Sequence, residues 1–513
     1  MKVLVTGGTG VVGAAAVRAL IAAGHQVRLF SRHAREDAAR WRGEIETREG
    51  SVDSPLDVTG VAEGCDAILH IAGIAEEKPP EITFDRVNVG GTQHLVTEAG
   101  RAGVCRFVYV SSLGADTGAS PYHASKLRAE NIVRGFQGSW LICRPGNVYG
   151  PGDEVISFLL QIVRGSPVAP LIDLGDQPFQ PLWAEDLGAA LAVAVERQDL
   201  SSRVLLLAGP ETTTMQDLTD RLARLTGRQP VQLPVPSALA TLGAQAASLL
   251  GLRVPFDDNK LTMLREGNVI PPGESNALTD ILAIRPTPLE EGLMELANSQ
   301  PEQLEGTGPL VRRRFWTRLE GVTRYPKELF EELRQRFFEL APEATLRDAG
   351  EPVEENRLAP GVTLTLALPL RGHVQVRVVE MTNNSMTLVT LAGHPLAGVN
   401  TFRFEGTPGH DLRFEVETCD RSATLIDDFA MRTVGLLMKR WTWATLVERV
   451  AKAFGSPEPI EVHNAEETLE GVAEQQALQE MERKIAAQAR EAEPDLQEEA
   501  RGKMAEAAAM KPV

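Results

Sequence analysis

The N-terminal stretch KVLVTGGTGVVGAAAVRAL places an apolar run, a glycine-rich turn and an Ala-rich helical pattern in direct succession. Its glycines follow the pattern Gly8-x-Gly10-x-x-Gly13. In a strand–turn–helix unit, such glycines make a tight turn, let a pyrophosphate approach the backbone, and leave amide groups at a helix N-terminus facing the anion. The stretch therefore predicts a dinucleotide-binding unit, with a purely structural glycine turn as the alternative.

Residues 1–298 continue to alternate short apolar runs with helical patterns. This rhythm is typical of βαβ units around a parallel sheet. Several of the runs are apolar on both faces, as strands covered by helices on both sides must be. We expect an α/β domain of the Rossmann type, a doubly wound parallel sheet, with strands at KVLVT, QVRLF, AILHI, RFVYVS, SWLICR and VLLLAG.

The rhythm changes near residue 308, where a second, α+β domain is expected to extend to 460. Residues 325–340 carry Leu and Phe at three- and four-residue spacing, which predicts an amphipathic helix. Five runs with period-two alternation follow between 362 and 419, and they predict an antiparallel sheet with one solvated face. A long helix over 423–454 closes the domain.

The last residues, 464–513, form a charged tail rich in Ala, Glu and Gln with few large apolar side chains. This composition predicts a solvated helix or a disordered segment rather than a packed element.

The overall charge narrows the classes of partner. The chain of 513 residues has a net charge of −18, and its only dense basic run lies at 312–314. Neither nucleic acid nor an anionic membrane surface is therefore an expected partner. The longest apolar stretch, residues 238–252, is too short to span a bilayer and predicts a buried or lid helix.

The cysteines and the start of the chain bear on location. Four cysteines are scattered without metal-ligand spacing: Cys65, Cys105, Cys143 and Cys419. They are typical of reduced thiols. The chain opens directly on a strand pattern, which leaves no room for a signal peptide. We expect a cytoplasmic protein without a metal centre.

The end of the second expected strand bears on the choice of cofactor. An acid near this point would accept hydrogen bonds from the adenosine ribose of NAD(H). The sequence has Phe30, Ser31 and Arg32 there instead, with Arg35 close by. Because the two arginines could face a 2′-phosphate, the sequence favours NADP(H), with NAD(H) as the alternative.

A Ser–Tyr–Lys constellation occurs in SSLGADTGASPYHASK, after the strand RFVYVS. Tyr122 and Lys126 are four residues apart, hence one turn apart on a helix. The Lys charge and a cationic nicotinamide both favour the phenolate, which makes Tyr122 a usable acid/base. Lys126 could also hold the nicotinamide ribose, and Ser112 could polarise a substrate carbonyl or hydroxyl. An aromatic and a cation on an ordinary helix face are the alternative.

Six motifs in order make the first domain resemble the short-chain dehydrogenase/reductase superfamily, in its extended or atypical NAD-dependent epimerase/dehydratase branch. They are TGGTGVVG, HIAG, VNVGGT, YVSS, YHASK and RPGNVYGPGD. The resemblance implies a proton relay or a strand-tying role for Asn88 beside the catalytic Ser112, Tyr122 and Lys126. It also implies a set of cofactor-binding residues: Gly7, Thr9, Gly10, Val11, Val12, Gly13, Ser31, Arg32, Ser51, Val52, Ala72, Gly73, Lys126, Pro145 and Val148.

The interval from Ser112 to Tyr122 is shorter than in typical sugar-nucleotide epimerases of this branch. It is similar to atypical relatives that include quinone- and flavin-linked reductases and the nucleotide-binding accessory subunit of respiratory complex I. Two functions therefore stay open. One is NAD(P)-dependent oxidoreduction of a carbonyl or alcohol, with a small-molecule substrate that is either apolar or polar. The other is a non-catalytic module that senses NADP(H) or stabilises an assembly. The sequence indicates neither the substrate nor the oligomeric state.

The second domain resembles, in the order of its elements, the helix-grip fold of START-like proteins. That resemblance implies a cavity for an apolar ligand between sheet and helix, while a sheet face filled by side chains is the alternative. His373, His394 and His410 are dispersed, so no metal site is expected among them. Trp441 and Trp443 are predicted to pack in the domain or to line its cavity.

Overall fold

The structure of the protein is a computed structural model. It describes residues 1–38, 41, 45–118, 120–165, 168–172, 175–227, 229–236, 268–341, 358–368, 372–424, 427–428 and 436–509. The apolar stretch 238–252 lies outside these residues, so its predicted lid helix is not part of the description. Among the described helices, none has the length and apolar character needed to cross a membrane.

A seven-stranded sheet forms the centre of the N-terminal domain, with the order β11-β6-β5-β4-β1-β2-β3. All six neighbouring pairs are parallel, which confirms the predicted Rossmann-like sheet. Its strands are β1 (Lys2–Thr6), β2 (Gln26–Ser31), β3 (Ile45–Glu49), β4 (Ala67–His70), β5 (Arg106–Val110), β6 (Ser139–Pro145) and β11 (Arg203–Leu207). The sequence did not predict β3, because it is an edge strand and its residues IETRE are mostly polar.

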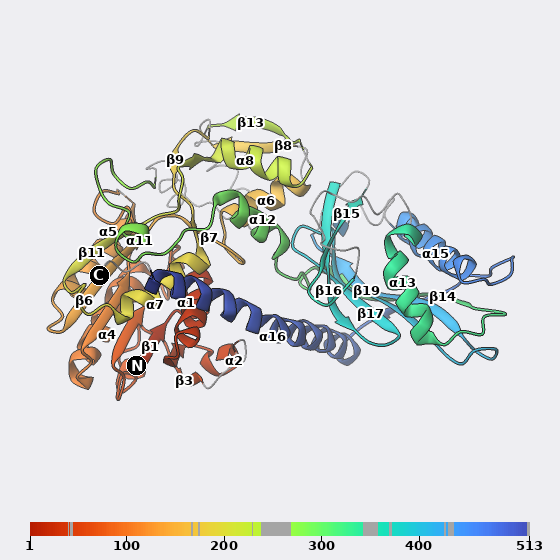
Figure 1. Ribbon diagram of the computed structural model, residues 1–513, viewed down its shortest axis with the longest axis horizontal. Helices are drawn as coiled ribbons and strands as arrows, with labels where there is room; N and C mark the ends of the chain where they lie inside the picture. Colours follow the sequence, from red (N-terminus) through yellow and green to blue (C-terminus); the bar gives the residue numbers. More distant parts are fainter. Residues whose placement is uncertain are drawn as a thin grey trace.

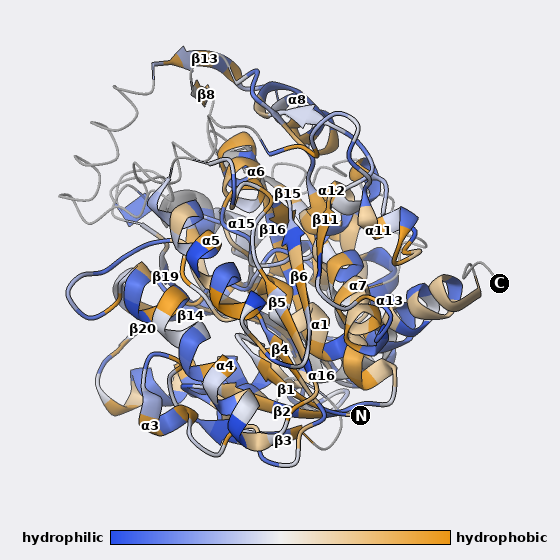
Figure 2. Cartoon of the chain, turned by 90° about the vertical axis from the view of Figure 1, so that its left-hand side faces the viewer, coloured by the Kyte–Doolittle hydropathy of each residue, from blue (hydrophilic) through white to orange (hydrophobic). Residues whose placement is uncertain are grey.

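Helices cover both faces of this sheet, as its doubly apolar strands require. Val3 and Val5 of β1 join the apolar cluster under α1 and α7, while Leu4 between them joins the cluster on the opposite face. Figure 2 shows these central strands in the colour of apolar residues. The helices are α1 (Val11–Ala22), α2 (Ala34–Ala38), α3 (Pro55–Val58), α4 (Gly91–Ala102), α5 (Pro121–Arg134), α7 (Ala184–Glu196) and α11 (Ala277–Asp280), with the π-helical turn η1 (Asp85–Gly90) before α4.

A smaller layer lies beyond the sheet, on the side of α6 and α8 in Figure 1. Tyr149, Leu160 and Trp183 belong to its apolar cluster. Its elements are β7 (Val148–Tyr149), α6 (Ile156–Gly165), β8 (Val168–Ile172), β9 (Pro178–Phe179), β10 (Leu182–Trp183), β12 (Thr213–Thr214), α8 (Met215–Leu225), β13 (Val231–Val235) and α12 (Leu289–Asn298).

The C-terminal domain is built on a second seven-stranded sheet, with the order β15-β16-β17-β18-β19-β14-β20 and antiparallel pairs throughout. Its elements are β14 (Thr307–Arg318), α13 (Pro326–Leu340), β15 (Thr363–Leu368), β16 (Gly372–Met381), β17 (Ser385–Thr390), β18 (Leu396–Glu405), β19 (Arg413–Ser422), α15 (Leu436–Ala453) and β20 (His463–Leu469). The sequence did not predict β14, because three consecutive arginines interrupt the alternation of apolar and polar residues that is typical of a strand.

The inner face of this sheet packs against α13 and α15. Phe402 of β18 lies with its ring centroid 5.4 Å from that of Phe337 and 5.7 Å from that of Trp443. The ring centroid of Phe404, two residues on, lies 4.8 Å from that of Phe414 and 5.6 Å from that of Phe454, the residue directly after α15. Aromatic rings with centroids at these distances are closely packed. Over the described residues, side chains fill this part of the interface between sheet and helices.

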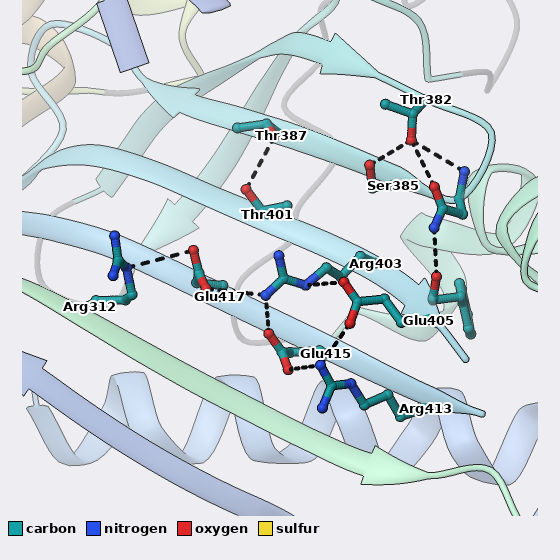
Figure 3. A network of polar contacts seen from close by, with 12 residues as sticks. Arg312, Thr382, Ser385, Thr387, Thr401, Arg403, Glu405, Arg413, Glu415 and Glu417 are labelled. Atoms are coloured by element: carbon teal, nitrogen blue, oxygen red, sulfur yellow. Dashed lines mark hydrogen bonds and ion pairs between the residues drawn. The ribbon is translucent and has the colours of Figure 1, made fainter. Parts of the chain in front are cut away.

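The outer face of the same sheet carries charged ladders. Arg403 of β18 contacts Glu415, Glu417 and Glu405, and Arg413 contacts Glu405 at 2.7 Å. Figure 3 shows these side chains projecting from one face of neighbouring strands. Such cross-strand pairs stabilise a sheet modestly and keep the face soluble.

The C-terminal tail differs from its prediction. Its first residues form the edge strand β20, which pairs with β14, and the rest forms α16 (Val472–Ala509). This helix has apolar residues that are almost completely buried, among them Met481, Ala500 and Ala507. Few apolar side chains are sufficient here, because small alanines let the helix lie close to its neighbours.

Candidate functional site

The predicted cofactor residues gather at one edge of the N-terminal sheet. Parallel strands all end at the same edge, and ligands of open α/β sheets bind there. The structure places every predicted position at the last residue of a strand of this sheet, in the segment directly after it, or on the element that follows. Gly7 to Gly13 follow β1, Ser31 and Arg32 end β2, Ser51 and Val52 follow β3, Ala72 and Gly73 follow β4, Ser112 follows β5, and Pro145 and Val148 lie at β6 and β7.

The glycine turn has room for a ligand on one side and none on the other. Gly7 has a φ of +69°, and a Cβ there would lie 2.6 Å from the backbone N of Ala72. A Cβ on Gly13 would lie 2.0 Å from the carbonyl O of Gly7. Gly10 is exposed, and nothing but the Gly7 carbonyl comes within 4 Å of its Cβ position. Only glycine fits the first two positions, while the third leaves the turn open.

The open side of the turn is the start of α1. Gly10 is the residue before the helix, and no side chain caps its first turn. The amide groups of that turn therefore face the edge of the sheet, where they could donate to a pyrophosphate. Thr9, Val11 and Val12 flank the turn and are half-buried. These residues fit a dinucleotide.

The predicted adenosine end contains one acid that the sequence prediction missed. Ser31 Oγ donates a hydrogen bond of 3.0 Å to Asp37 Oδ2, so a carboxylate from α2 lies beside the end of β2. Arg32 is exposed, and Arg35 pairs with Glu49 at 3.8 Å. The only signal for Asp37 is an acidic residue in the first turn of a short helix.

Two predicted adenine contacts lie after β3. The backbone N of Ser51 donates to Asp57 Oδ2 at 3.0 Å. Val52 is buried and packs on the start of α4, where a Cβ on Gly91 would lie 2.9 Å from its side chain. Val52 is thus a wall of the site, and Ser51 is its neighbour at the rim.

Helix α5 brings the Ser–Tyr–Lys residues together. It starts with Pro121 after the N-cap Ser120, whose Oγ accepts from the backbone N of His123 at 3.1 Å. This cap fixes the first turn, which carries Tyr122. The side chain of Ser112 lies near enough to Tyr122 to lower the pKa of its phenol. Lys126 Nζ donates to the carbonyl O of Val110 at 2.9 Å and lies 6.0 Å from the centroid of the Tyr122 ring.

Gly73 closes the group from the β4 side. A Cβ built on this exposed glycine would lie 3.4 Å from Lys126 Nζ and 3.1 Å from Asn88 Oδ1. The end of β4 thus borders the predicted catalytic residues directly. A ligand that lies over Gly73 would contact Lys126.

Burial sets the protonation of the two titratable residues. It raises the pKa of Tyr122 to about 12, although the side chain of Ser112 lowers that pKa. Burial lowers the pKa of Lys126 to about 8, although the charge of Glu130 raises it. Tyr122 therefore keeps its proton at neutral pH, as a general acid must. Lys126 is charged at neutral pH, and it loses its proton as the pH rises through about 8.

Asn88 ties the loop after β4 to α5. Its Oδ1 accepts from the backbone N of Ile74 at 2.8 Å, and its Nδ2 donates to Ile74 O at 3.1 Å and to Ser125 Oγ at 2.9 Å. Of the two roles implied by the resemblance, these contacts correspond to the tying of structural elements.

A buried ion network behind the site was not predicted. Glu130, four residues after Lys126, is completely buried. Its carboxylate accepts from Ser111 Oγ at 2.6 Å and from Arg144. Arg144 also pairs with Asp116, in the short segment between Ser112 and Tyr122. The available signal was an arginine inside the apolar run of β6.

The last two predicted cofactor residues are less accessible. Pro145 is buried, and its carbonyl O accepts from the backbone N of Leu113 at 2.9 Å. Val148 is half-buried and packs on the core beneath α1 and α7. Both therefore position the loops around the site.

The C-terminal residues named from the sequence do not converge. His373 belongs to β16, while His394 and His410 lie in turns before β18 and β19. Within the described part of the chain, no group of His, Cys, Asp and Glu side chains could hold a metal ion. Trp443 packs on Phe402, whereas Trp441 is 57% exposed.

Comparison with known proteins adds relatives of the N-terminal domain. A model of the NAD dependent epimerase/dehydratase family matches residues 3–207. Ceramide reductase from Caulobacter vibrioides is 34% identical over 248 residues, which cover 47% of this chain and 76% of the relative. 2-alkyl-3-oxoalkanoate reductase from Stenotrophomonas maltophilia is 32% identical over 255 residues, with coverage of 44% and 76%. Subunit 9 of the NADH dehydrogenase [ubiquinone] 1 alpha subcomplex from Arabidopsis thaliana is 24% identical over 261 residues, with coverage of 49% and 64%.

Proposed function

The chain belongs to the NAD dependent epimerase/dehydratase family, and on this basis we propose that it is an oxidoreductase acting on a carbonyl or an alcohol. The observation that carries the proposal is the position of Tyr122, near Ser112 and one helical turn before Lys126, whose Nζ lies 6.0 Å from the centroid of the Tyr122 ring. This group lies at the edge of the sheet that carries the open glycine turn.

In the direction of reduction, the hydroxyls of Ser112 and Tyr122 hold the substrate oxygen. Tyr122 then donates its proton to that oxygen as negative charge develops on it. The charge of Lys126 stabilises the phenolate that remains. A bound nicotinamide cofactor supplies the hydride. Gly7 to Gly13 would hold the pyrophosphate of that cofactor, and Gly73 would leave room for it beside Lys126.

NADP(H) is the cofactor that we propose. Arg32 is exposed at the end of β2 and could pair with a 2′-phosphate. Asp37 is the counter-argument, because its carboxylate lies beside Ser31 and could bind a ribose hydroxyl instead. Direct comparison of the affinities for the two cofactors decides between them.

The substrate class that we propose is a carbonyl on a molecule with substantial hydrocarbon. Two relatives that are 32–34% identical are named for the reduction of a ceramide and of an oxoalkanoate. The test is NADPH consumption with matched short-chain and long-chain ketones, together with quinones and aldehydes. Turnover confined to polar sugars would contradict this substrate class.

A non-catalytic nucleotide-binding module is the second candidate. The relative from a respiratory complex supports it, and so does the bond of Lys126 to the carbonyl of Val110 rather than to Tyr122. In that case NADPH would bind tightly, but no substrate of the panel would oxidise it.

For the C-terminal domain we propose a helix-grip architecture of the START-like kind. The order of β14, α13, five antiparallel strands and α15 supports this fold. The aromatic packing around Phe402 favours a filled interior over the cavity for an apolar ligand. Mass spectrometry of the purified protein tests this point, because a cavity would retain a lipid.

A cytoplasmic location is also part of the proposal. All four cysteines are free thiols, and Cys65, Cys143 and Cys419 are buried. Unpaired cysteines are typical of a reducing compartment. Localisation of a tagged full-length chain is the direct test.

A further inference from the structure

Helix α16 connects the two domains of the chain. In Figure 1 it runs from the C-terminal sheet to α1 and α7 of the N-terminal domain. Its first half covers an apolar patch on the outer sheet face through Ala477 and Met481. Its last turns join the core of the N-terminal domain through Met504 and Ala507. The last turns of α16 are therefore packed against α1, the helix that follows the glycine turn.

The last turns of α16 also supply a charge. Lys503 Nζ pairs with Asp186, a carboxylate in the first turn of α7 whose side chain is 1% exposed. Lys503 also donates to Thr287 Oγ1 at 2.8 Å. Thr287 in turn donates to Asp186 through its backbone N at 2.6 Å and its Oγ1 at 2.8 Å. Lys503 is thus the cation at a buried carboxylate that joins α7 to the chain before α12.

A short packed route leads from this pair to the glycine turn. Two residues before Asp186, Ala184 starts α7. A Cβ built on Gly150 would lie 2.9 Å from the Ala184 Cβ and 3.7 Å from Cγ1 of Val11. Val11 is the first residue of α1, directly after Gly10. Gly150 therefore lies between Ala184, at the start of α7, and Val11, next to the predicted pyrophosphate site.

A second link joins α7 to α1. Arg18 of α1 donates to Glu185 of α7 at 2.5 Å, and both side chains are mostly buried. Burial raises the pKa of Glu185, Arg18 lowers it, and two residues of α16 act more weakly, Glu499 raising it and Lys503 lowering it. The position of α7 relative to α1 thus depends on a cluster of buried charges that includes Lys503.

We propose that Lys503 is a positioning residue that the C-terminal helix supplies to the nucleotide site. It neutralises Asp186, and it thereby holds the start of α7 against Gly150 and the turn that precedes α1. The inference rests on the proposed nucleotide binding by that turn. Docking of α16 and binding of the nucleotide are then coupled, because both stabilise the same arrangement of α1 and α7.

The test measures NADPH affinity by fluorescence titration and thermal unfolding on full-length variants. Lys503→Met leaves Asp186 without its cation, and we expect affinity to fall by about fivefold or more. Lys503→Arg restores a cation, and its affinity should return to within about twofold of the unmutated chain. If the Met variant does not fold, Lys503→Gln replaces it, since it removes the charge but keeps a donor.

Two further variants separate positioning from general stability. Lys484→Met, in the first half of α16, removes an ion pair with Glu380 of 2.6 Å and should leave NADPH affinity unchanged. In an Asp186→Asn background, Lys503→Met should cause no further loss of affinity, because the two residues act as one unit.

The outcomes distinguish this inference from the proposed function. A lower unfolding temperature with unchanged NADPH affinity in Lys503→Met would mean that the lysine only stabilises the fold, and the inference would be wrong. Equal losses in Lys503→Met and Lys484→Met would also overturn it. Failure of the unmutated chain to bind NADPH or NADH would overturn the proposed function and this inference with it.

Discussion

Glu130 and Arg144 form a two-pronged ion pair, in which Arg144 Nε donates to Oε1 and Nη2 donates to Oε2, each at 2.8 Å. Both side chains are buried, and the pair joins α5 to β6 behind the Ser–Tyr–Lys residues. The same carboxylate accepts from Ser111, and the same guanidinium reaches Asp116. The pair therefore holds the segment at Ser111 and again at Asp116, on either side of Ser112.

Glu130→Gln should lower the free energy of unfolding by about 3 kcal/mol, because it leaves Arg144 buried without its full counter-charge. Urea denaturation measures the loss. Arg134→Gln is the matched control, since Arg134 contacts the same carboxylate but is 34% exposed; it should cost about 1 kcal/mol or less. Equal losses in the two variants would show that the buried pair is not the main contributor.

The glycine turn is tested with Gly10→Glu. The new carboxylate would occupy the place of the pyrophosphate, so calorimetry should detect no cofactor binding. Gly100→Glu is the control, because this glycine is exposed on α4 with nothing within 4 Å of its Cβ position. Unchanged affinity in Gly10→Glu would exclude this turn as the cofactor site.

Cofactor choice is tested at the end of β2. If Arg32 pairs with a 2′-phosphate, the unmutated protein binds NADPH more tightly than NADH, and Arg32→Ala weakens NADPH selectively. Asp37→Asn should act in the opposite direction, since it removes a negative charge beside the same site. Equal affinities of the unmutated chain for both cofactors would contradict the NADP(H) assignment.

Tyr122→Phe removes the transferable proton and keeps the ring. With a substrate in hand, turnover should fall by about two to four orders of magnitude while cofactor affinity stays nearly constant. Tyr325→Phe is the control, because this tyrosine is 63% exposed in the C-terminal domain. Lys126→Met should lower both turnover and affinity. A Tyr122→Phe variant with full turnover would require hydride transfer without this tyrosine as the acid.

The pH dependence follows from Lys126. Its pKa of about 8 means that its charge is lost as pH rises through that value. Reduction should therefore slow above about pH 8, because the phenolate of Tyr122 loses its stabilising cation. The contribution of Lys126 to the stability of the fold changes with pH in the opposite direction. The folded pKa lies below the usual value of 10.5, so the unfolded chain binds more protons between these values and Lys126 favours folding increasingly as pH rises.

Urea unfolding of the unmutated chain and of Lys126→Met across this pH range measures that contribution. The difference in stability between them should grow in favour of the unmutated chain as pH rises from about 8 to 10.5. A constant difference would show that the pKa of Lys126 is not lowered in the folded state.

The sequence by itself determined the N-terminal fold and the neighbourhood of its site. KVLVT, RFVYVS and the other doubly apolar runs can be buried only between helices, and parallel strands of one sheet end at one edge. This is why residues as distant as Gly10, Gly73 and Tyr122 could be assigned to one site before any contact was known. The amphipathic pattern of α13 was equally sufficient, because it depends on spacing within one segment.

Only the tertiary structure decided the interactions that depend on partners far apart in sequence. The pairing of β20 with β14, the Glu130–Arg144 pair and the approach of Asp37 to Ser31 leave no periodic signal in the segments concerned. The clearest case is α16, whose sequence predicts a solvated or disordered tail. It is ordered because Lys503 and Ala507 meet Asp186 and the α1–α7 core more than three hundred residues earlier in the chain, and no local pattern records that meeting.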